Sequence, residues 1–525
     1  MGQQWWRNAA IYQIYVRSFA DSDGDGVGDL PGVRRRLSHI AELGMDAVWL
    51  TPFYASPMAD GGYDVADYRM VDPLFGRLAD AEGLIADAHW LGLRVIVDLV
   101  PNHTSSQHPW FAEALAAEPG SPARARYHFR DGVNGGPPND WESMFGGPAW
   151  TQLPDGQWYL HLFDAAQPDL NWEHLDVHAE FENILRFWLG RGVDGIRIDV
   201  AHGLVKADGL PDARCTGQSG LLTTTAMPFF DQDGVHEIYR RWRKILDSYP
   251  GERIGVAEAW VPDADRLARY LRPDELHQAF NFHYTQAKWS ATEFRTVIDD
   301  SLAAVAGVGA ASTWVLSNHD IERHVTRFGG GRTGLRRARA AALLTMALPG
   351  SVYVYQGEEL GLPEVTDLPE EVLADPKWER SGRAERGRDG CRVPIPWSGT
   401  TPPFGFGPSS AWLPQPTEWA ALTVKAQRDD PGSTLSLYTA ALRLRRGLPD
   451  GELTWLDSDA DVLAFRREPG FTCTVNFGSA PVRLSRPGRL LLTSTEESEL
   501  EQSEQTVTLP PNSAAWWTGD DTHAR

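Results

Sequence analysis

The stretch Gly192-Val-Asp-Gly-Ile-Arg-Ile-Asp-Val-Ala-His202 places two charged side chains inside a run of apolar residues with β character. An apolar run bounded by glycine is typical of a buried parallel strand. Arg197 and Asp199 are two residues apart, so both side chains lie on one face of the predicted strand. Burying a guanidinium and a carboxylate is costly unless they pair or act on a ligand. By itself, the stretch fits either an ordinary buried ion pair or a functional site.

Strand and helix patterns alternate on both sides of this stretch. Strand-like runs occupy residues 9–16, 47–52, 94–103, 193–200, 253–260, 278–282, 312–320 and 351–356. Helical periodicity covers 30–43, 78–91, 177–190, 235–247 and 435–446. Such alternation indicates βαβ units on a parallel sheet. Eight strands in this rhythm predict an α/β fold of the (β/α)8 barrel type.

Two segments break the rhythm. Residues 104–174 are rich in Gly, Pro, Asn and Trp and too long for a plain loop, which predicts an inserted subdomain after the third strand. After Gly447 the pattern changes to short alternating strands at 462–465, 471–475, 489–492 and 505–509, which predict an all-β C-terminal sandwich domain. The predicted domains are the barrel (1–103 and 175–447), the insertion (104–174) and the C-terminal domain (448–525).

Composition excludes several classes of partner. The 525 residues carry a formal net charge of −22, which argues against binding to nucleic acid or to an anionic membrane surface. The longest apolar stretch, 340–355, is interrupted by Pro349-Gly350 and is too short to span a bilayer, and the N-terminus lacks signal-peptide features. Three cysteines far apart do not form a disulfide framework (Cys215, Cys391, Cys473). A soluble cytoplasmic protein without a membrane partner is predicted, as a monomer or homodimer.

An acidic loop precedes the first predicted helix, with Asp21, Asp23, Asp25 and Asp29 separated largely by glycine. Hard cations prefer several oxygen ligands from a tight loop, and glycine permits the turns. The loop is not an EF-hand, because its twelfth position is Gly32 rather than an acidic residue. The alternative, a solvated acidic turn, leaves like charges crowded together. We therefore expect a Ca²⁺ or Mg²⁺ site, with the choice between the two ions open.

Polar side chains collect at the predicted C-terminal ends of several strands. They are Asp98, Asn102, His103, Arg197, Asp199, Glu258, His319 and Asp320. In a (β/α)8 barrel these strand ends face one common mouth. A converging set of carboxylates with so little positive charge is difficult to explain as packing. Paired carboxylates perform glycoside hydrolysis, one as nucleophile or base and the other as acid, so this chemistry is predicted.

Four motifs then resemble those of glycoside hydrolase family 13, the α-amylase family, in order and over nearly the whole chain. They are Asp98-Leu-Val-Pro-Asn-His103, Gly195-Ile-Arg-Ile-Asp199, Glu258 in Val-Ala-Glu-Ala-Trp, and Ser317-Asn-His-Asp320. Gln167-Pro-Asp-Leu-Asn171 resembles the signature of the α-glucosidase and oligo-1,6-glucosidase branch. The acidic loop is similar to the metal site of that branch, which implies ligands from Asp21, Asp23, Asp25, Val27 and Asp29. Branch members often have Asn at position 23.

The resemblance implies a retaining mechanism through a covalent glucosyl-enzyme. Asp199 is then the nucleophile, Glu258 the general acid/base, and Asp320 the stabiliser of the oxocarbenium-like transition state. Arg197 is expected to hold Asp199 ionised. The matching substrate-binding positions are Asp60, Tyr63, His103, Arg197, His319 and Arg388, with Phe145 and Phe163 as either pocket wall or core. The pairing of Arg388 with Asp60 implies a grip on non-reducing-end hydroxyls and hence exo action.

The function implied is an exo-acting α-glucosidase that hydrolyses short α-glucosides of the maltose, maltooligosaccharide or isomaltose type, with some transglucosylation. Val200 resembles the residue of α-1,6-acting members, whereas Thr or Ala is commoner in α-1,4-acting ones, so linkage stays open. The alternative is a trehalose synthase or a sucrose-using isomerase or transferase of the same family. A non-catalytic barrel of the transporter-subunit type is disfavoured, because such proteins need a membrane segment and usually lack the carboxylates.

Overall fold

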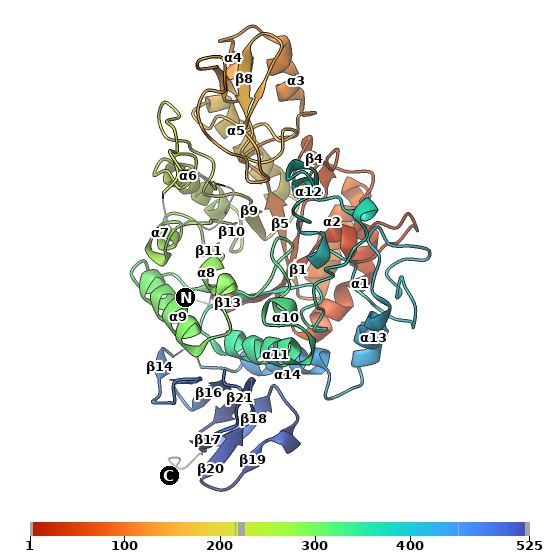
Figure 1. The fold of residues 1–525 in the computed structure, drawn as a ribbon, viewed down its shortest axis with the longest axis vertical. Coiled ribbons are helices and arrows are strands. Elements are labelled where there is room, and N and C mark those ends of the chain that lie inside the picture. The colour runs from red at the N-terminus through yellow and green to blue at the C-terminus, as the bar shows by residue number, and fades with distance from the viewer. Residues whose placement is uncertain (1–3, 216, 219–225, 450, 520–525) are drawn as a thin grey trace.

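The computed structural model describes residues 4–215, 217–218, 226–449 and 451–519. Its central sheet consists of eight parallel strands: β1 (Ala10–Ile14), β2 (Ala47–Leu50), β5 (Arg94–Leu99), β9 (Gly195–Ile198), β10 (Ile254–Ala257), β11 (Gln278–Ala279), β12 (Thr313–Val315) and β13 (Ser351–Tyr355). They pair in the order β11-β10-β9-β5-β2-β1-β13-β12, which curves into a nearly closed barrel (Figure 1). The predicted (β/α)8 barrel is confirmed.

Several strands end earlier than their apolar runs do. β9 ends at Ile198, because Val200 takes a left-handed conformation (φ 45°) that the strand cannot continue. β12 ends at Val315, so the Ser317–Asp320 motif lies in the following loop. The sixth strand is only two residues long, because the Asn281 side chain accepts the Tyr284 N–H and caps α8 (Phe282–Gln286). Consequently the polar residues stand on loops just beyond the barrel rim.

Helices surround the barrel. Five lie where periodicity predicts them: α1 (Leu30–Leu43), α2 (Leu78–Trp90), α5 (Leu175–Leu189), α6 (Val235–Asp247) and α14 (Thr434–Arg445). Others were not predicted: α7 (Ala264–Arg269), α9 (Ala291–Ala306), α10 (His324–Arg327), α11 (Gly331–Ala347), α12 (Pro376–Arg380) and α13 (Val424–Gln427). The apolar stretch 340–355 is the end of α11 followed by β13. Among the helices described, none has the length and apolar character needed to cross a membrane.

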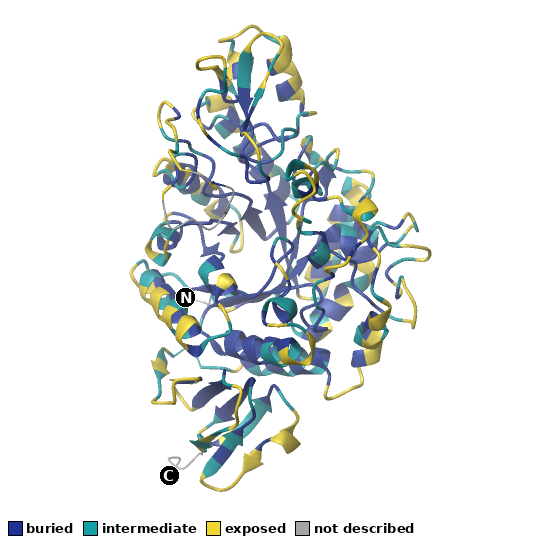
Figure 2. Ribbon diagram, in the orientation of Figure 1, coloured by how far each residue is buried: buried dark blue, intermediate teal, exposed yellow. Residues whose placement is uncertain are grey.

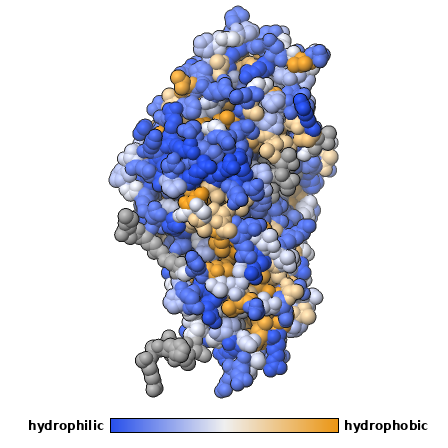
Figure 3. All heavy atoms as spheres, turned by 90° about the vertical axis from the view of Figure 1, so that its left-hand side faces the viewer, coloured by the Kyte–Doolittle hydropathy of each residue, from blue (hydrophilic) through white to orange (hydrophobic). Residues whose placement is uncertain are grey.

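The barrel interior is a packed apolar core that supports the rim. Trp49, Ile96, Val256, Phe280 and Tyr353 project from different strands or from the residues beside them into one cluster. Apart from Arg94 at the start of β5, every residue of the eight barrel strands is buried, whereas exposed residues lie outside the barrel (Figure 2). Hydrophilic residues cover most of the face drawn in Figure 3, with apolar groups scattered between them. The packed apolar interior of the barrel thus lies directly below the polar residues at the rim and supports them.

The segment between β5 and α5 forms a substructure above the rim, at the top of Figure 1. It contains α3 (Pro109–Ala116), α4 (Pro122–Ala125) and an antiparallel sheet of β6 (Phe129–Asp131), β8 (Gln157–Leu160) and β7 (Trp150–Gln152). A buried carboxylate joins it to the barrel: Asp169 Oδ2 lies 2.8 Å from Lys206 Nζ and accepts from Asn102 Nδ2 at 3.0 Å. A small hairpin, β3 (Tyr54–Ala55) with β4 (Asp67–Val71), lies after β2.

The C-terminal part consists of two antiparallel sheets, which confirms the predicted all-β class. One contains β14 (Leu453–Trp455), β15 (Val462–Arg467), β16 (Phe471–Asn476), β21 (Ser513–Thr518) and β18 (Arg489–Thr493). The other contains β17 (Val482–Ser485), β20 (Thr506–Leu509) and β19 (Glu501–Gln502). Trp517 and Val507 pack in the apolar cluster that joins the two sheets. Trp516, on the opposite face, donates its indole N–H to Leu343 O of α11 at 3.1 Å.

Candidate active site

A cavity of about 410 Å³ opens among the loops that follow the barrel strands. Nine of the predicted site residues line it: Asp60, Tyr63, His103, Phe145, Phe163, Asp199, Glu258, Asp320 and Arg388. Arg197 and His319, both fully buried, are the two predicted residues that support this wall from behind. The remaining lining residues were not predicted as site residues: Met144, Val200, His202, Trp260, Lys377, Glu385, Arg386 and Gly387. The structure thus brings all the predicted catalytic and substrate-binding residues together.

Arg197 is the centre of the charged network in the cavity wall. Its NH1 lies 2.7 Å from Asp199 Oδ1 and 2.7 Å from Asp98 Oδ1, while its NH2 lies 2.8 Å from Glu258 Oε2. The backbone N–H of Val200 donates to the same Glu258 oxygen at 3.0 Å, and Trp260 donates its indole N–H to Oε1 at 3.2 Å. Asp199 and Glu258 are therefore close neighbours with fixed orientations.

One guanidinium faces three carboxylates, and this imbalance sets the protonation of the site. Burial raises the pKa of Asp199 well above its usual range, and the charges of Glu258, Asp98 and Asp320 add to the shift. The sequence predicted that Arg197 would hold Asp199 ionised. Arg197 does lower the pKa of Asp199, but burial outweighs it, so the charge of Arg197 alone does not hold Asp199 ionised. Burial also raises the pKa of Asp98 to about 6. A cluster that retains both a proton and negative charge near neutral pH has the components of acid/base catalysis.

Asp320 is held in the opposite state. Burial opposes its ionisation, but His319, Arg388 and Arg392 outweigh burial and hold the pKa of Asp320 below its usual range. NH1 of Arg388 and NH2 of Arg392 each lie 2.9 Å from Asp320 Oδ1. The His319 ring stacks on the Tyr63 ring at 5.2 Å between centroids, and burial lowers the pKa of His319 to about 3. Asp320 therefore carries a negative charge at neutral pH, next to the neutral imidazole of His319.

Asp60 and Arg388 form an ion pair in the cavity wall. Arg388 NH2 lies 2.7 Å from Asp60 Oδ1, and Gln167 Nε2 donates to Asp60 Oδ2 at 3.2 Å. Burial raises the pKa of Asp60 to about 6 against the opposing charges of Arg388 and Arg392. Gln167 also lies 3.1 Å from His103 Nε2, and burial lowers the pKa of His103 to about 4. These groups form a polar cradle that offers both donors and acceptors to hydroxyl groups.

Phe145 and Phe163 bring apolar surface from the insertion to the cavity. Their rings meet edge to face at 5.6 Å, and Phe163 lies 5.3 Å from the His103 ring. The Arg388 guanidinium carbon stands 4.9 Å from the Phe145 ring centroid. Both rings belong to an apolar cluster and also line the cavity, so they are pocket wall and core at once.

Sequence reasoning missed several residues that support this site. Arg392 lies four residues after Arg388, and a second arginine so close to a predicted site residue was a signal that could have been used. It is buried, and its NH2 lies 2.9 Å from Asp320 Oδ1. His202 was quoted only as the boundary of the strand, yet it is fully buried and lines the cavity. Asp375, whose Oδ2 lies 2.5 Å from Arg388 Nε, comes from the irregular connection between β13 and α14, where no strand or helix pattern indicated its position.

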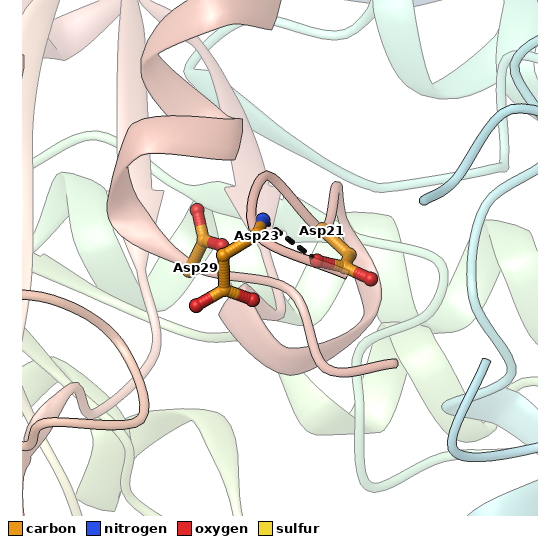
Figure 4. Close-up of side chains that lie close together, drawn as sticks. All are labelled: Asp21, Asp23 and Asp29. Atoms are coloured by element: carbon orange, nitrogen blue, oxygen red, sulfur yellow. Dashed lines mark hydrogen bonds between the residues drawn. The ribbon is translucent and has the colours of Figure 1, made fainter. Parts of the chain in front are cut away.

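Three carboxylates of the acidic loop converge before α1 (Figure 4). One oxygen from each of Asp21, Asp23 and Asp29 lies within 4.8 Å of the others. Hard oxygen donors in one tight loop fit Ca²⁺ or Mg²⁺, and such an ion would hold the loop in place. Asp25 is not among the three converging carboxylates, and its Oδ1 accepts the Val27 N–H at 2.8 Å. Ligation by Asp25 and by the Val27 carbonyl stays a prediction.

The α-amylase catalytic-domain family model matches residues 13–450. A probable α-glucosidase of Rhizobium meliloti (strain 1021) is 38% identical over 489 residues, covering 89% of this chain and 88% of the relative. An oligo-1,6-glucosidase of Parageobacillus thermoglucosidasius is 35% identical over 478 residues, covering 85% and 84%. The chain therefore belongs to the α-amylase family, glycoside hydrolase family 13, in its branch of α-glucosidases and oligo-1,6-glucosidases. It is an enzyme of the glycoside hydrolase class.

Solved structures are similar over almost the full length. The crystal structure of the α-glucosyl transfer enzyme XgtA aligns with a TM-score of 0.90 at 36% identity, covering 98% of this chain and 100% of that one. A trehalulose synthase, MutB, aligns with a TM-score of 0.90 at 30% identity, covering 98% and 100%. The same scaffold therefore occurs in proteins named for glucosyl transfer and for isomer synthesis.

Proposed function

We propose that the protein is an exo-acting retaining α-glucosidase that removes terminal glucose from short α-glucosides. The observation that carries this proposal is the Arg388 guanidinium, which lies 2.7 Å from Asp60 and 2.9 Å from Asp320 in the cavity wall. This contact closes the cavity behind one sugar ring. A substrate can then enter only by its chain end, and the bond to be cleaved lies toward the mouth.

The catalytic step uses the two carboxylates beside Arg197. The step requires the cluster to keep its negative charge on Asp199, despite the burial that raises the pKa of Asp199, and its proton on Glu258. Asp199 then attacks the anomeric carbon while Glu258 gives that proton to the glycosidic oxygen, so the bond to the leaving sugar breaks as the ester bond forms. Glu258 then takes a proton from water, whose oxygen displaces Asp199 and releases glucose. Contacts of both carboxylates with one guanidinium favour the short separation, about 5–5.5 Å, of retaining enzymes.

The surrounding charges suit a transition state with positive character at the sugar ring. Asp320 stays ionised in the cavity wall and would stabilise that charge. His103 and His319 stay neutral because burial lowers their pKa values, so they add no opposing positive charge. Arg197 is shared among three carboxylates and fixes their positions.

The variant Asp199→Asn tests the assigned nucleophile. Because the amide cannot form the ester intermediate, turnover of an aryl α-glucoside should fall by about a thousandfold or more. The thermal unfolding midpoint should stay near that of the parent protein, and the exposed variant Asp176→Asn should keep full activity. Turnover within tenfold of the parent rate would remove Asp199 from this role.

Glucosyl transfer or isomerisation is the second candidate, favoured by the structural similarity to XgtA and MutB. The catalytic residues would be the same, since the outcome depends on whether water or a sugar hydroxyl attacks the glucosyl-enzyme. Chromatography of products from maltose, isomaltose, sucrose and trehalose separates the two. Two glucose molecules for each maltose consumed, with no new oligosaccharide, support hydrolysis. New disaccharides or trisaccharides as main early products, alongside the leaving sugar, support transfer.

Two further proposals concern the protein's surroundings. The loop of Asp21, Asp23 and Asp29 would bind Ca²⁺ or Mg²⁺ as a structural ion, supported by its converging carboxylates. A reducing compartment such as the cytoplasm is proposed because Cys215, Cys391 and Cys473 are all free thiols.

A further inference from the structure

Asp375 is a buried carboxylate that contacts Arg388 from behind the cavity wall, and its side chain is fully inaccessible to solvent. It belongs to the connection between β13 and α14, directly before α12. Its Oδ2 accepts the Arg388 backbone N–H at 2.8 Å and lies 2.5 Å from Arg388 Nε. Asp375 does not line the cavity, so its contacts reach a substrate only through Arg388.

The three nitrogens of the Arg388 guanidinium each meet a different carboxylate. Nε meets Asp375, NH1 meets Asp320 at 2.9 Å, and NH2 meets Asp60 at 2.7 Å. Because a guanidinium is planar, fixing its Nε edge also fixes the directions of NH1 and NH2. Asp375 therefore determines where the cavity-facing edge of Arg388 points before any substrate arrives.

Packing against Gly387 and the charges of two arginines keep Asp375 in its position beside Arg388. A Cβ added to Gly387, whose φ is 73°, would stand 2.5 Å from the Asp375 carboxyl carbon, so glycine is what permits the close approach. Burial opposes ionisation of Asp375, but Arg388 and Arg392 outweigh it and hold the pKa of that carboxyl at about 2. The charge of Asp375 is thus present at every working pH.

We propose that Asp375 is a positioning residue that sets recognition of the terminal sugar's hydroxyls by holding Arg388 against Asp60 and Asp320. This inference rests on the proposed function, because it concerns the same sugar-binding cavity. An arginine held in place before binding loses little conformational freedom when it donates to a hydroxyl. A loosened Arg388 would instead weaken the preference for a sugar that carries those hydroxyls.

A purely local role is the competing explanation. Asp375 Oδ1 also accepts the Lys377 N–H at 2.9 Å and so caps α12. The variant Asp375→Asn retains an oxygen for this cap and removes the charge that holds Arg388. Asp375→Ser is a second variant that keeps a capping oxygen if the first does not fold. Asp367→Asn, an exposed acid on the same connection, is the matched control.

The experiment compares 4-nitrophenyl α-D-glucopyranoside with its 4-deoxy analogue. Asp375→Asn should reduce the preference for the parent glucoside in kcat/KM by about tenfold, the usual worth of a charge-assisted hydrogen bond. KM for the parent glucoside should carry most of the loss, with kcat changing less, and Asp367→Asn should match the wild type. An unchanged preference in folded Asp375→Asn or Asp375→Ser, or an equal loss on both substrates, would overturn the proposal.

A protein that is not an α-glucosidase would give a result distinct from a failure of the positioning role of Asp375. If the wild-type protein turns over no α-glucoside, the proposed function fails, and a crystal structure of Asp375→Asn then decides the positioning role. An Arg388 guanidinium turned away from Asp60 supports that role. The same guanidinium position as in the wild type contradicts it.

Discussion

Val200 donates its backbone N–H to Glu258 Oε2 over 3.0 Å from a left-handed conformation with φ 45°. β-Branched residues seldom adopt this region, so the turn after β9 is strained. Gly203 lies close by, where an added Cβ would stand 2.6 Å from Val200 Cγ1. The turn thus connects the residue after the candidate nucleophile to the candidate acid/base, and Val200 lines the cavity together with both of them.

Val200→Thr should shift linkage preference toward α-1,4 bonds. Thr has nearly the same shape and branching, so the variant keeps the strained backbone and replaces one methyl by a hydroxyl. We expect the ratio of maltose to isomaltose turnover to rise by about tenfold, as small changes in a pocket wall allow. Turnover of an aryl α-glucoside serves as the control and should stay within severalfold. An unchanged ratio would separate linkage preference from this position.

Substrate affinity should weaken in acid because of Asp60. Burial raises the pKa of this carboxyl to about 6, so it takes up a proton as the pH falls through that value and loses its charged contact with Arg388. KM for an aryl α-glucoside should therefore be flat above about pH 6 and rise below it. Asp60→Asn should have a higher KM at every pH without this acid rise. The same acid rise in the variant would assign the titration to another group.

Chelation should destabilise the protein without changing the initial rate. An ion bound by Asp21, Asp23 and Asp29 adds stability according to its concentration relative to Kd, about 2.7 kcal/mol at a hundredfold excess. EDTA should lower Tm by several degrees, and Ca²⁺ or Mg²⁺ should restore it. Asp21→Asn should remove most of this response, while Asp25→Asn tests whether that side chain takes part. A Tm insensitive to EDTA in the wild type would contradict the metal site.

Much of the fold could be predicted because barrel strands are buried on both sides and contain uninterrupted apolar runs. The same property made their ends hard to place: nothing in the run 193–200 marks the left-handed turn at Val200. α11 was overlooked because its last residues and β13 form one continuous apolar stretch, 340–355. Here tertiary packing on both the barrel and the C-terminal sheet hides the helical periodicity.

Some residues of the candidate site could likewise be predicted from the sequence, and others could not. Residues at strand ends, such as Asp199 and Glu258, could be placed together because parallel strands share one mouth. Asp375 could not, because it lies on an irregular connection whose path no periodicity specifies. The ratio of one guanidinium to three carboxylates in the site could not be predicted either. Which carboxylates Arg197 contacts depends on distances in the folded protein and not on their spacing in the sequence.

The anomer of the first glucose released is the most direct test of a covalent glucosyl-enzyme on Asp199. Attack by Asp199 inverts the anomeric carbon once, and attack by water inverts it again. Proton NMR during the first minutes of aryl α-glucoside hydrolysis, where the leaving group is a phenol and not a second glucose, resolves the two anomers before mutarotation equilibrates them. With a retaining mechanism, α-glucose should accumulate first, and β-glucose should follow only at the rate of mutarotation. β-Glucose as the first product would contradict a covalent intermediate on Asp199.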